Sequence, residues 1–295
     1  MQAHRLLDQP IIRPDTPGWD ETATGRNING PSLIRVPDWI KNPLGRYYLY
    51  FAHHQGRSIR LAYADELTGP WTIHTPGTLT IEQTPFKNHI ASPDLHVRPD
   101  RGELVMIYHG CGGVKPAPHI EQPAAVAVSR DGLNWEHRDV LPAESYVRGF
   151  ELEGSTLGVS KAGRLYEATP DGFDFSQRVG SLDISGRHFA VSVEGNDVDV
   201  FYSRWGDAPE HILHFHATGW EGLQRWHLAE RRSLLRPERD WEGADRPVHP
   251  SRIGSVHEPV HELRDPAAFR DDDGRRYLVY SVAGESGLAI AELTP

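Results

Sequence analysis

The chain has 295 residues, of which 38% are hydrophobic and 24% are charged. Its 28 glycines and 23 prolines recur at short intervals, which suits many short strands better than long helices. We therefore expect a soluble, mostly β protein in one domain, residues 1–295. The net charge of −10, without any block of lysine or arginine, argues against nucleic acid as a partner.

The start of the chain shows no targeting segment. Residues 1–15 have neither a basic start nor the apolar run of a secretory signal, and no stretch approaches about 18 consecutive apolar residues. Cys111 is the only cysteine, so no disulfide can form within the chain, and we expect its thiol to be inert. These features predict a cytoplasmic protein that has no membrane partner.

The first of five similar segments begins with an apolar strand at Ser32–Val36. Strands at Arg46–Ala52 and Ser58–Ala64 follow, and we expect an outer strand near Thr78–Ile81. Trp71 stands before that outer strand, and a second tryptophan, residue 135, has the matching place in the next segment. Both tryptophans are expected to pack between sheets.

The same order of parts recurs along the rest of the chain. Repeats of this size, built from short strands, indicate the blades of a β-propeller. The last repeat contains Asp271–Gly274, which lacks the later ligands of a calcium loop and is interpreted as a hairpin turn. The four further repeats occupy residues 92–135, 148–168, 188–217 and 265–293.

The fifth repeat lacks a fourth strand of its own. Gln9–Pro14 resembles the outer strand of the fourth repeat, Ser233–Pro237. We therefore expect the N-terminal strand to complete the last blade, which closes the ring and removes a free sheet edge. The predicted fold is an all-β, five-bladed propeller.

The innermost strands of a propeller line its axis, so residues at the start of these strands converge from distant parts of the chain. Here the starting segments are richer in polar and charged residues than buried strands require. They predict a pocket on the axis. The five segments are Asn27–Pro31, His89–Asp94, Tyr146–Arg148, Arg187–His188 and Glu262–Pro266.

Two of these segments resemble motifs of a known superfamily. Arg264-Asp265-Pro266 is similar to the Arg-Asp-Pro segment of invertase-like fructosidases, and Ser92-Pro93-Asp94 is similar to the Ala-Pro-Asp segment of arabinanases. The chain thus resembles, as a distant member, the five-bladed propeller glycosidases, which include arabinanases, β-xylosidases, invertase-like fructosidases and mannoside phosphorylases. The resemblance implies a glycoside hydrolase. One position departs from it, because Asn29 lies where many members carry the Asp that acts as base or nucleophile.

Cleavage of a glycoside generally needs one protonated carboxyl group and one carboxylate. Asp94 and Asp265 are the leading pair. The neighbouring guanidinium of Arg264 should favour the charged form of Asp265, so Asp94 or Glu258 is the candidate acid. The alternative for the two aspartates is structural, because Asp beside Pro often caps a turn through hydrogen bonds to the backbone.

Other polar residues near strand ends are candidates for binding a sugar. The histidines could hydrogen-bond hydroxyl groups, move protons near neutral pH or bind a metal together, although none has a metal-ligand spacing. No cofactor is required by this interpretation, and a divalent metal at the axis stays an alternative. The predicted substrate-binding residues are Asn29, His53, His109, Arg148, His188, Arg204, Arg264 and Glu285.

The leading functional hypothesis is a glycosidase that acts on the end of a small oligosaccharide or on a simple glycoside. A metal-assisted lyase or isomerase of sugars on the same scaffold is the first alternative, suggested by Asn29 and the histidines. A propeller that binds carbohydrate without catalysis is the second, because a fold alone does not determine function. In each case the expected partner is a small carbohydrate.

Overall fold

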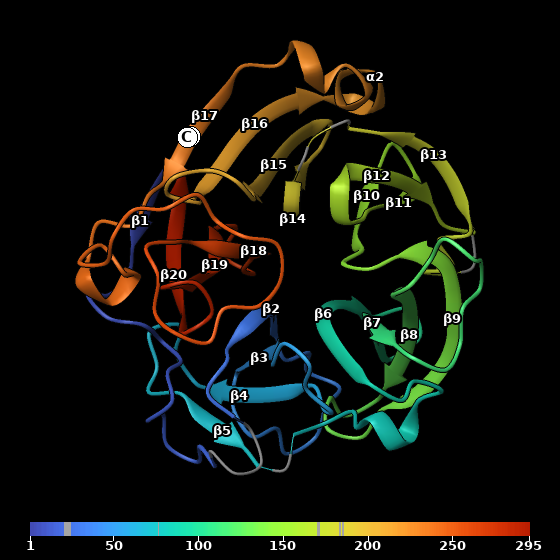
Figure 1. The fold of residues 1–295 in the computed structure, drawn as a ribbon. Coiled ribbons are helices and arrows are strands. Elements are labelled where there is room, and N and C mark those ends of the chain that lie inside the picture. The colour runs from blue at the N-terminus through green and yellow to red at the C-terminus, as the bar shows by residue number, and fades with distance from the viewer. Residues whose placement is uncertain (21–24, 76, 170–171, 183, 185) are drawn as a thin grey trace.

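The computed structural model describes residues 1–20, 25–75, 77–169, 172–182, 184 and 186–295. Five antiparallel sheets of four strands stand around a central axis like the blades of a propeller (Figure 1). This arrangement confirms the predicted fold. Within the described residues, no helix is long and apolar enough to cross a membrane.

Each blade is described from its inner strand outward. Blade one contains β2 (Asn29–Arg35), β3 (Tyr47–Ala52), β4 (Arg60–Ala64) and β5 (Thr72–His74). Blade two contains β6 (His89–Arg98), β7 (Glu103–Cys111), β8 (Pro123–Ser129) and β9 (Glu136–Glu144). Blade three contains β10 (Arg148–Leu152), β11 (Ser155–Val159), β12 (Arg164–Glu167) and β13 (Gln177–Ser181).

Blade four contains β14 (Gly186–Glu194), β15 (Asp197–Arg204), β16 (Ile212–Thr218) and β17 (Arg231–Leu235). Blade five contains β18 (Arg264–Arg270), β19 (Arg276–Val282), β20 (Gly287–Thr294) and, as its outer strand, β1 (Gln2–Arg5). Short helical turns lie between strands. They are η1 (Ile81–Gln83), η2 (Lys161–Gly163), α2 (Gly219–Gln224), η3 (Trp226–Leu228) and η4 (Asp240–Glu242).

The core lies between the blades, and β3 shows why the sequence folds in this way. Every residue of this strand is buried. Because side chains alternate along a strand, Tyr48 and Tyr50 pack in the cluster shared with blade two, while Leu49 and Phe51 pack in the cluster shared with blade five. A strand that is apolar on both faces therefore needs a neighbouring sheet on each side. Trp71 and Trp135 are buried in these two clusters, as predicted.

The ring closes as predicted but through a different segment. Gln2–Arg5 pairs with β20, whereas the predicted segment Gln9–Pro14 forms only a bridge between Ile12 and Leu288. The outer strand of blade one is also corrected, because Thr72–His74 pairs with β4 while the predicted residues 78–81 lead into η1. The expected hairpin turn at Asp271–Gly274 is present, with the Gly274 amide donating to the Asp271 carbonyl.

Three inner strands share an irregularity at a proline. The register of β2, β6 and β18 shifts where Gly30, Ser92 and Asp265 each precede a proline. These three residues have positive φ angles of 56°, 51° and 50°. The proline has no N–H to donate, so a bulge forms there, and a left-handed backbone is costly for Ser and Asp. Such strain often marks a functional site, and here it lies at the start of the inner strands.

Candidate active site at the start of the inner strands

The five inner strands surround the axis (Figure 1), and their first residues meet at one end of it, as the contacts of Gly30 and His188 with Asp265 show. Arg148 separates the two ends. Its guanidinium donates to the carbonyls of Pro93 at 2.7 Å and Pro31 at 3.1 Å, and it pairs with Asp94 at 3.2 Å. The side chain therefore bridges blades one, two and three.

We name the group formed by Asn29, Tyr146, His188, Asp265 and Glu285 the strand-start site.

Asp265 is the best-enclosed carboxylate of this site, with 2% of its surface exposed. Its Oδ2 accepts hydrogen bonds from the Gly30 amide at 3.3 Å and the Ser281 hydroxyl at 3.1 Å. Its Oδ1 pairs with Nδ1 of His188. Burial alone would raise the pKa of Asp265, but His188 and then Arg264 hold it well below its usual range. The charged form is stabilised as predicted, with His188 rather than Arg264 as the main cause.

The ring of His188 is held on two sides. Asp265 fixes Nδ1, and the ring of Tyr146 lies against the imidazole with the centroids 4.1 Å apart. Among the described residues, the only polar contact of the ring is the one through Nδ1, and no hydrogen bond reaches the other ring nitrogen, Nε2. Burial lowers the pKa of His188 more than Asp265 raises it, so the ring is neutral near pH 7. The site thus holds a neutral imidazole whose Nε2 is available for a proton.

A second histidine continues this stack of rings. His109 lies on the other face of Tyr146, with the ring centroids 4.6 Å apart, and it is 2% exposed. Burial, helped by nearby His89 and His54, holds the pKa of His109 well below its usual range. The structure therefore places His109 beside His188, as two neutral rings separated by a tyrosine.

Glu285 is the second carboxylate at this end of the axis. It accepts from the side-chain amides of Asn27 and, at 3.2 Å, Asn29, while Nη1 of Arg264 donates to it at 3.0 Å. Burial opposes its charge, and the negative charge of Asp265 does so too, yet His54 and Arg264 hold the pKa of Glu285 below its usual value. Two carboxylates, Asp265 and Glu285, therefore stand charged within reach of each other.

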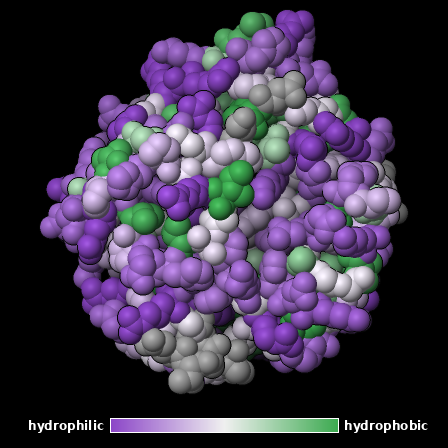
Figure 2. All heavy atoms as spheres, viewed as in Figure 1, coloured by the Kyte–Doolittle hydropathy of each residue, from purple (hydrophilic) through white to green (hydrophobic). Residues whose placement is uncertain are grey.

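Buried ion pairs hold the wall of the site. Arg187 donates from Nε and Nη2 to Glu210, at 2.8 Å to 3.1 Å, and Arg264 pairs with Glu262. Both arginines also donate to the Gly254 carbonyl, so the loop between β17 and β18 crosses this end of the axis. The face seen in Figure 2 is mainly hydrophilic, with hydrophobic residues in small separate groups. Sequence reasoning missed Glu210, because its isolated position in a loop carries no motif.

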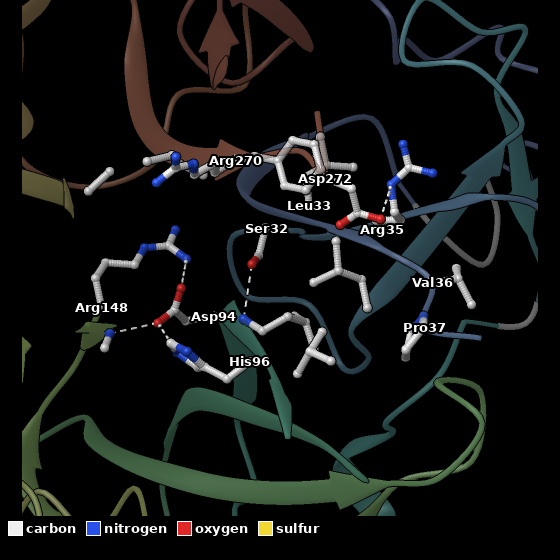
Figure 3. Close-up of a pocket in the computed structure, with 18 of the residues that line it drawn as sticks. Ser32, Leu33, Arg35, Val36, Pro37, Asp94, His96, Arg148, Arg270 and Asp272 are labelled. Atoms are coloured by element: carbon white, nitrogen blue, oxygen red, sulfur yellow. Dashed lines mark hydrogen bonds and ion pairs between the residues drawn. The ribbon is translucent and has the colours of Figure 1, made fainter. Parts of the chain in front are cut away.

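The structure does not bring the predicted pair of aspartates together. Asp94 lies two residues beyond the bulge of β6 and lines a cavity of about 570 Å³ at the far end of the axis, whereas Asp265 does not line this cavity. Asp94 accepts from Gly149 and His96, each at 2.8 Å, and pairs with Arg148 (Figure 3). Burial opposes its charge, but His96 and Arg148 hold the pKa of Asp94 below its usual value. A carboxylate stabilised in this way does not suit the predicted role of acid.

Three other predicted residues lie outside the strand-start site. Glu258 is exposed on the loop between β17 and β18. Arg204 is exposed and pairs with Asp207 at 2.7 Å, as a solvated surface pair does. His53 is partly buried, and burial lowers its pKa to about 4. Within the described ranges, no three His, Cys, Asp or Glu side chains are placed to share a metal ion.

No family model matches the chain. The uncharacterized protein R118 of Acanthamoeba polyphaga mimivirus is 33% identical to it in an alignment that covers 90% of this chain and 83% of the viral protein. The chain therefore has a relative of similar length over most of its sequence.

Solved structures of GH43 proteins have the same fold. CoXyl43, a β-xylosidase/α-arabinofuranosidase from a compost microbial metagenome solved with xylotriose, matches with a TM-score of 0.65 and 11% identity, over 99% of this chain and 95% of that one. BlXynB of Bacillus licheniformis matches with a TM-score of 0.61 and 13% identity, over 99% of this chain. This chain spans 55% of BlXynB. At such identities the likeness is one of fold.

Proposed function

Since this chain belongs to the family of the mimivirus protein R118 and shares the five-bladed fold of GH43 glycoside hydrolases, we propose that it is itself a glycoside hydrolase. The proposed reaction takes place at the strand-start site. The substrate is a small oligosaccharide or a simple glycoside, and a terminal sugar is released.

One observation carries this proposal, namely the buried pair of Asp265 and His188. An aspartate bound to Nδ1 keeps the proton on that nitrogen and leaves Nε2 free to exchange a proton with the substrate or with water. A neutral His188 would act as a base that takes a proton from the attacking water. The oxygen of that water bonds to the anomeric carbon as the glycosidic bond breaks, and the leaving oxygen takes up a proton from solvent. In this scheme His188 is the catalytic residue, and Asp265 positions it and stabilises its charged form.

The two carboxylates support the same chemistry. Hydrolysis of a glycoside passes through a transition state with positive charge at the anomeric carbon. The charges of Asp265 and Glu285 stand together at this end of the axis, and they would stabilise that charge. Asp265 and Glu285 would therefore act as two charged stabilisers, and neither would take the role of acid that was predicted for Asp94 or Glu258.

The expected release of terminal sugars rests on Arg148. Its guanidinium joins the carbonyls of Pro31 and Pro93 across the axis, so the strand-start site ends at this side chain. A site that is closed at its inner end admits the end of a sugar chain more readily than its middle. Arg148 would thus close the inner end of the site and favour the release of terminal sugars over cleavage within a sugar chain.

The first test is a panel of chromogenic glycosides. We expect the purified protein to hydrolyse at least one of them, and an oligosaccharide of the same sugar to yield the monosaccharide as its first product. Treatment with EDTA is expected to leave the rate unchanged. Tight sugar binding without any turnover would contradict the proposal, and loss of activity in EDTA would contradict the proposed role of His188 without a metal.

The second test concerns the pH dependence of the rate. Because the pKa of His188 is lowered from its ordinary value of about 6.5, kcat/KM is expected to fall only below that pH, as the base becomes protonated. His188→Gln should lower kcat/KM by about 100-fold or more and remove this acidic limb. Circular dichroism across the same pH range controls for unfolding. An unchanged acidic limb in the variant would show that another group titrates.

A further inference from the structure

The cavity at the other end of the axis takes no part in the proposed reaction. Its volume of about 570 Å³ lies within the range of sites that hold small molecules, about 300 to 1,000 Å³. We name it the strand-end cavity, and Leu33, Asp94, His96, Arg148, Val191 and Phe269 are among its lining residues. The side chain of Arg148 stands between this cavity and the strand-start site.

The wall of the strand-end cavity combines polar backbone edges with apolar side chains that lie between them. All five inner strands are the terminal strand of their sheets, so each has a free edge at the axis (Figure 1). Free strand edges present unpaired N–H and C=O groups. Between these edges lie apolar side chains such as Leu33, Val191 and Phe269. Such a surface suits a ligand that carries hydroxyl groups around an apolar ring.

Asp94 gives the cavity a fixed acceptor at its inner end (Figure 3). The carboxylate receives three hydrogen bonds, from Arg148, Gly149 and His96, and its side chain keeps 14% of its surface exposed. A carboxylate has about four acceptor positions, so it retains capacity for one more donor. A ligand hydroxyl could therefore bind Asp94 without displacing any of its partners.

The positively and negatively charged side chains that line the cavity are equal in number. Three arginines and three aspartates face it, and Arg35 pairs with Asp272 at 3.2 Å near the mouth. A site without net charge gives no electrostatic advantage to an anion or a cation. The balance thus favours a neutral ligand. The six charged residues are Arg35, Asp38, Asp94, Arg148, Arg270 and Asp272.

We propose that the strand-end cavity binds a small neutral saccharide, separately from the strand-start site. A hydroxyl group of the sugar donates to Asp94, the free strand edges bind other hydroxyl groups, and the apolar face of the ring packs on Phe269. This binding does not depend on hydrolysis at the other end of the axis.

Isothermal titration calorimetry with xylose, arabinose, galactose and glucose tests this proposal without any turnover. We expect at least one of the four to bind the wild-type protein at millimolar concentrations. Ala268→Trp should abolish that binding, because residue 268 lines the cavity and an indole would fill it. Asp94→Asn should weaken binding by about 10-fold or more, since a charged acceptor is lost. Asp265→Asn tests whether the measured binding belongs to the strand-start site instead, and Asp199→Asn, a buried aspartate outside both the strand-start site and the cavity lining, serves as the matched control that should leave the binding unchanged.

Each other result overturns the proposal. Binding that persists in Ala268→Trp would mean that the sugar lies elsewhere, and binding that is lost only in Asp265→Asn would assign it to the strand-start site. The absence of binding by all four sugars would leave the cavity without the proposed ligand. Tighter binding of glucuronate or glucosamine than of glucose would contradict the neutral class. Near-ultraviolet circular dichroism confirms that each variant is folded, so Ala268→Trp remains decisive if Asp94→Asn unfolds.

Discussion

Replacing Asp265 with asparagine is expected to lower kcat/KM on the best glycoside by about 1,000-fold or more. The carboxylate now accepts the Nδ1 proton of His188. An amide group at this position could donate to Nδ1 instead, which would place the imidazole proton on Nε2, the nitrogen that must accept it. The variant also removes one of the two negative charges that are proposed to stabilise the anomeric carbon in the transition state. Steady-state kinetics of the folded variant provide the measurement.

Asp199 provides a matched control for this variant. It is also a buried aspartate bound by histidines, at 2.9 Å from His214 and 3.1 Å from His216, and it pairs with Arg276. These residues lie on β15, β16 and β19, opposite the later residues of β14 and β18 and away from the strand-start site. Asp199→Asn should therefore lower the free energy of unfolding but leave kcat/KM of the folded protein unchanged. An equal loss of activity in both variants would show that Asp265 matters only for folding.

Arg5→Met is expected to destabilise the protein by about 3 to 5 kcal/mol, because it leaves the charge of Glu242 buried and unpaired. Arg5 lies on the closing strand and donates to both oxygens of Glu242, at 2.8 Å and 2.9 Å, while Tyr280 on β19 donates to the same carboxylate at 3.3 Å. Glu242 is fully buried. Urea unfolding followed by tryptophan fluorescence measures the change.

A second partner of Arg5 makes a close control. Glu238 also pairs with Arg5, at 3.0 Å, but 62% of its side chain is exposed. Exposed pairs contribute little, so Glu238→Gln should change the stability by no more than about 0.5 kcal/mol. Adding Glu242→Gln to Arg5→Met removes the unpaired charge and should restore part of the loss. Equal effects of the Arg5 and Glu238 variants would indicate that closure does not depend on the buried pair.

The fold was predictable because its main signals are local and repeated. A strand such as Tyr47–Ala52, apolar on both faces, requires sheets on either side, and five such repeats define the ring. The identity of the strand that closes the ring was harder to predict from the sequence. Gln9–Pro14 resembles an outer strand, yet Gln2–Arg5 pairs with β20, and Arg5 of this strand contacts Glu242, which is 237 residues away in the sequence. Sequence similarity between two segments carries no information about a contact between residues so far apart in the chain.

The candidate site was predictable in part. The residues that start the inner strands do converge, which is a property of the fold, so Asp265 and His188 lie together. Glu285 joins them from the turn between β19 and β20, where it accepts a hydrogen bond from Asn29. The pairing of Asp94 with Asp265 was wrong because a bulge precedes Asp94 and turns it toward the far cavity. Simple alternation along a strand cannot place a residue beyond such a bulge. Likewise, no pattern links the loop residue Glu210 with Arg187.

The last blade of this ring takes three strands from the end of the sequence and one from its beginning. During synthesis on a ribosome, residues 2–5 emerge long before β20 and must then wait for it, because β20 extends to Thr294. Contacts so far apart form late and slowly. Until then the incomplete propeller leaves uncovered the apolar face of blade one that packs against blade five, and this interval is when the nascent protein most needs protection from aggregation.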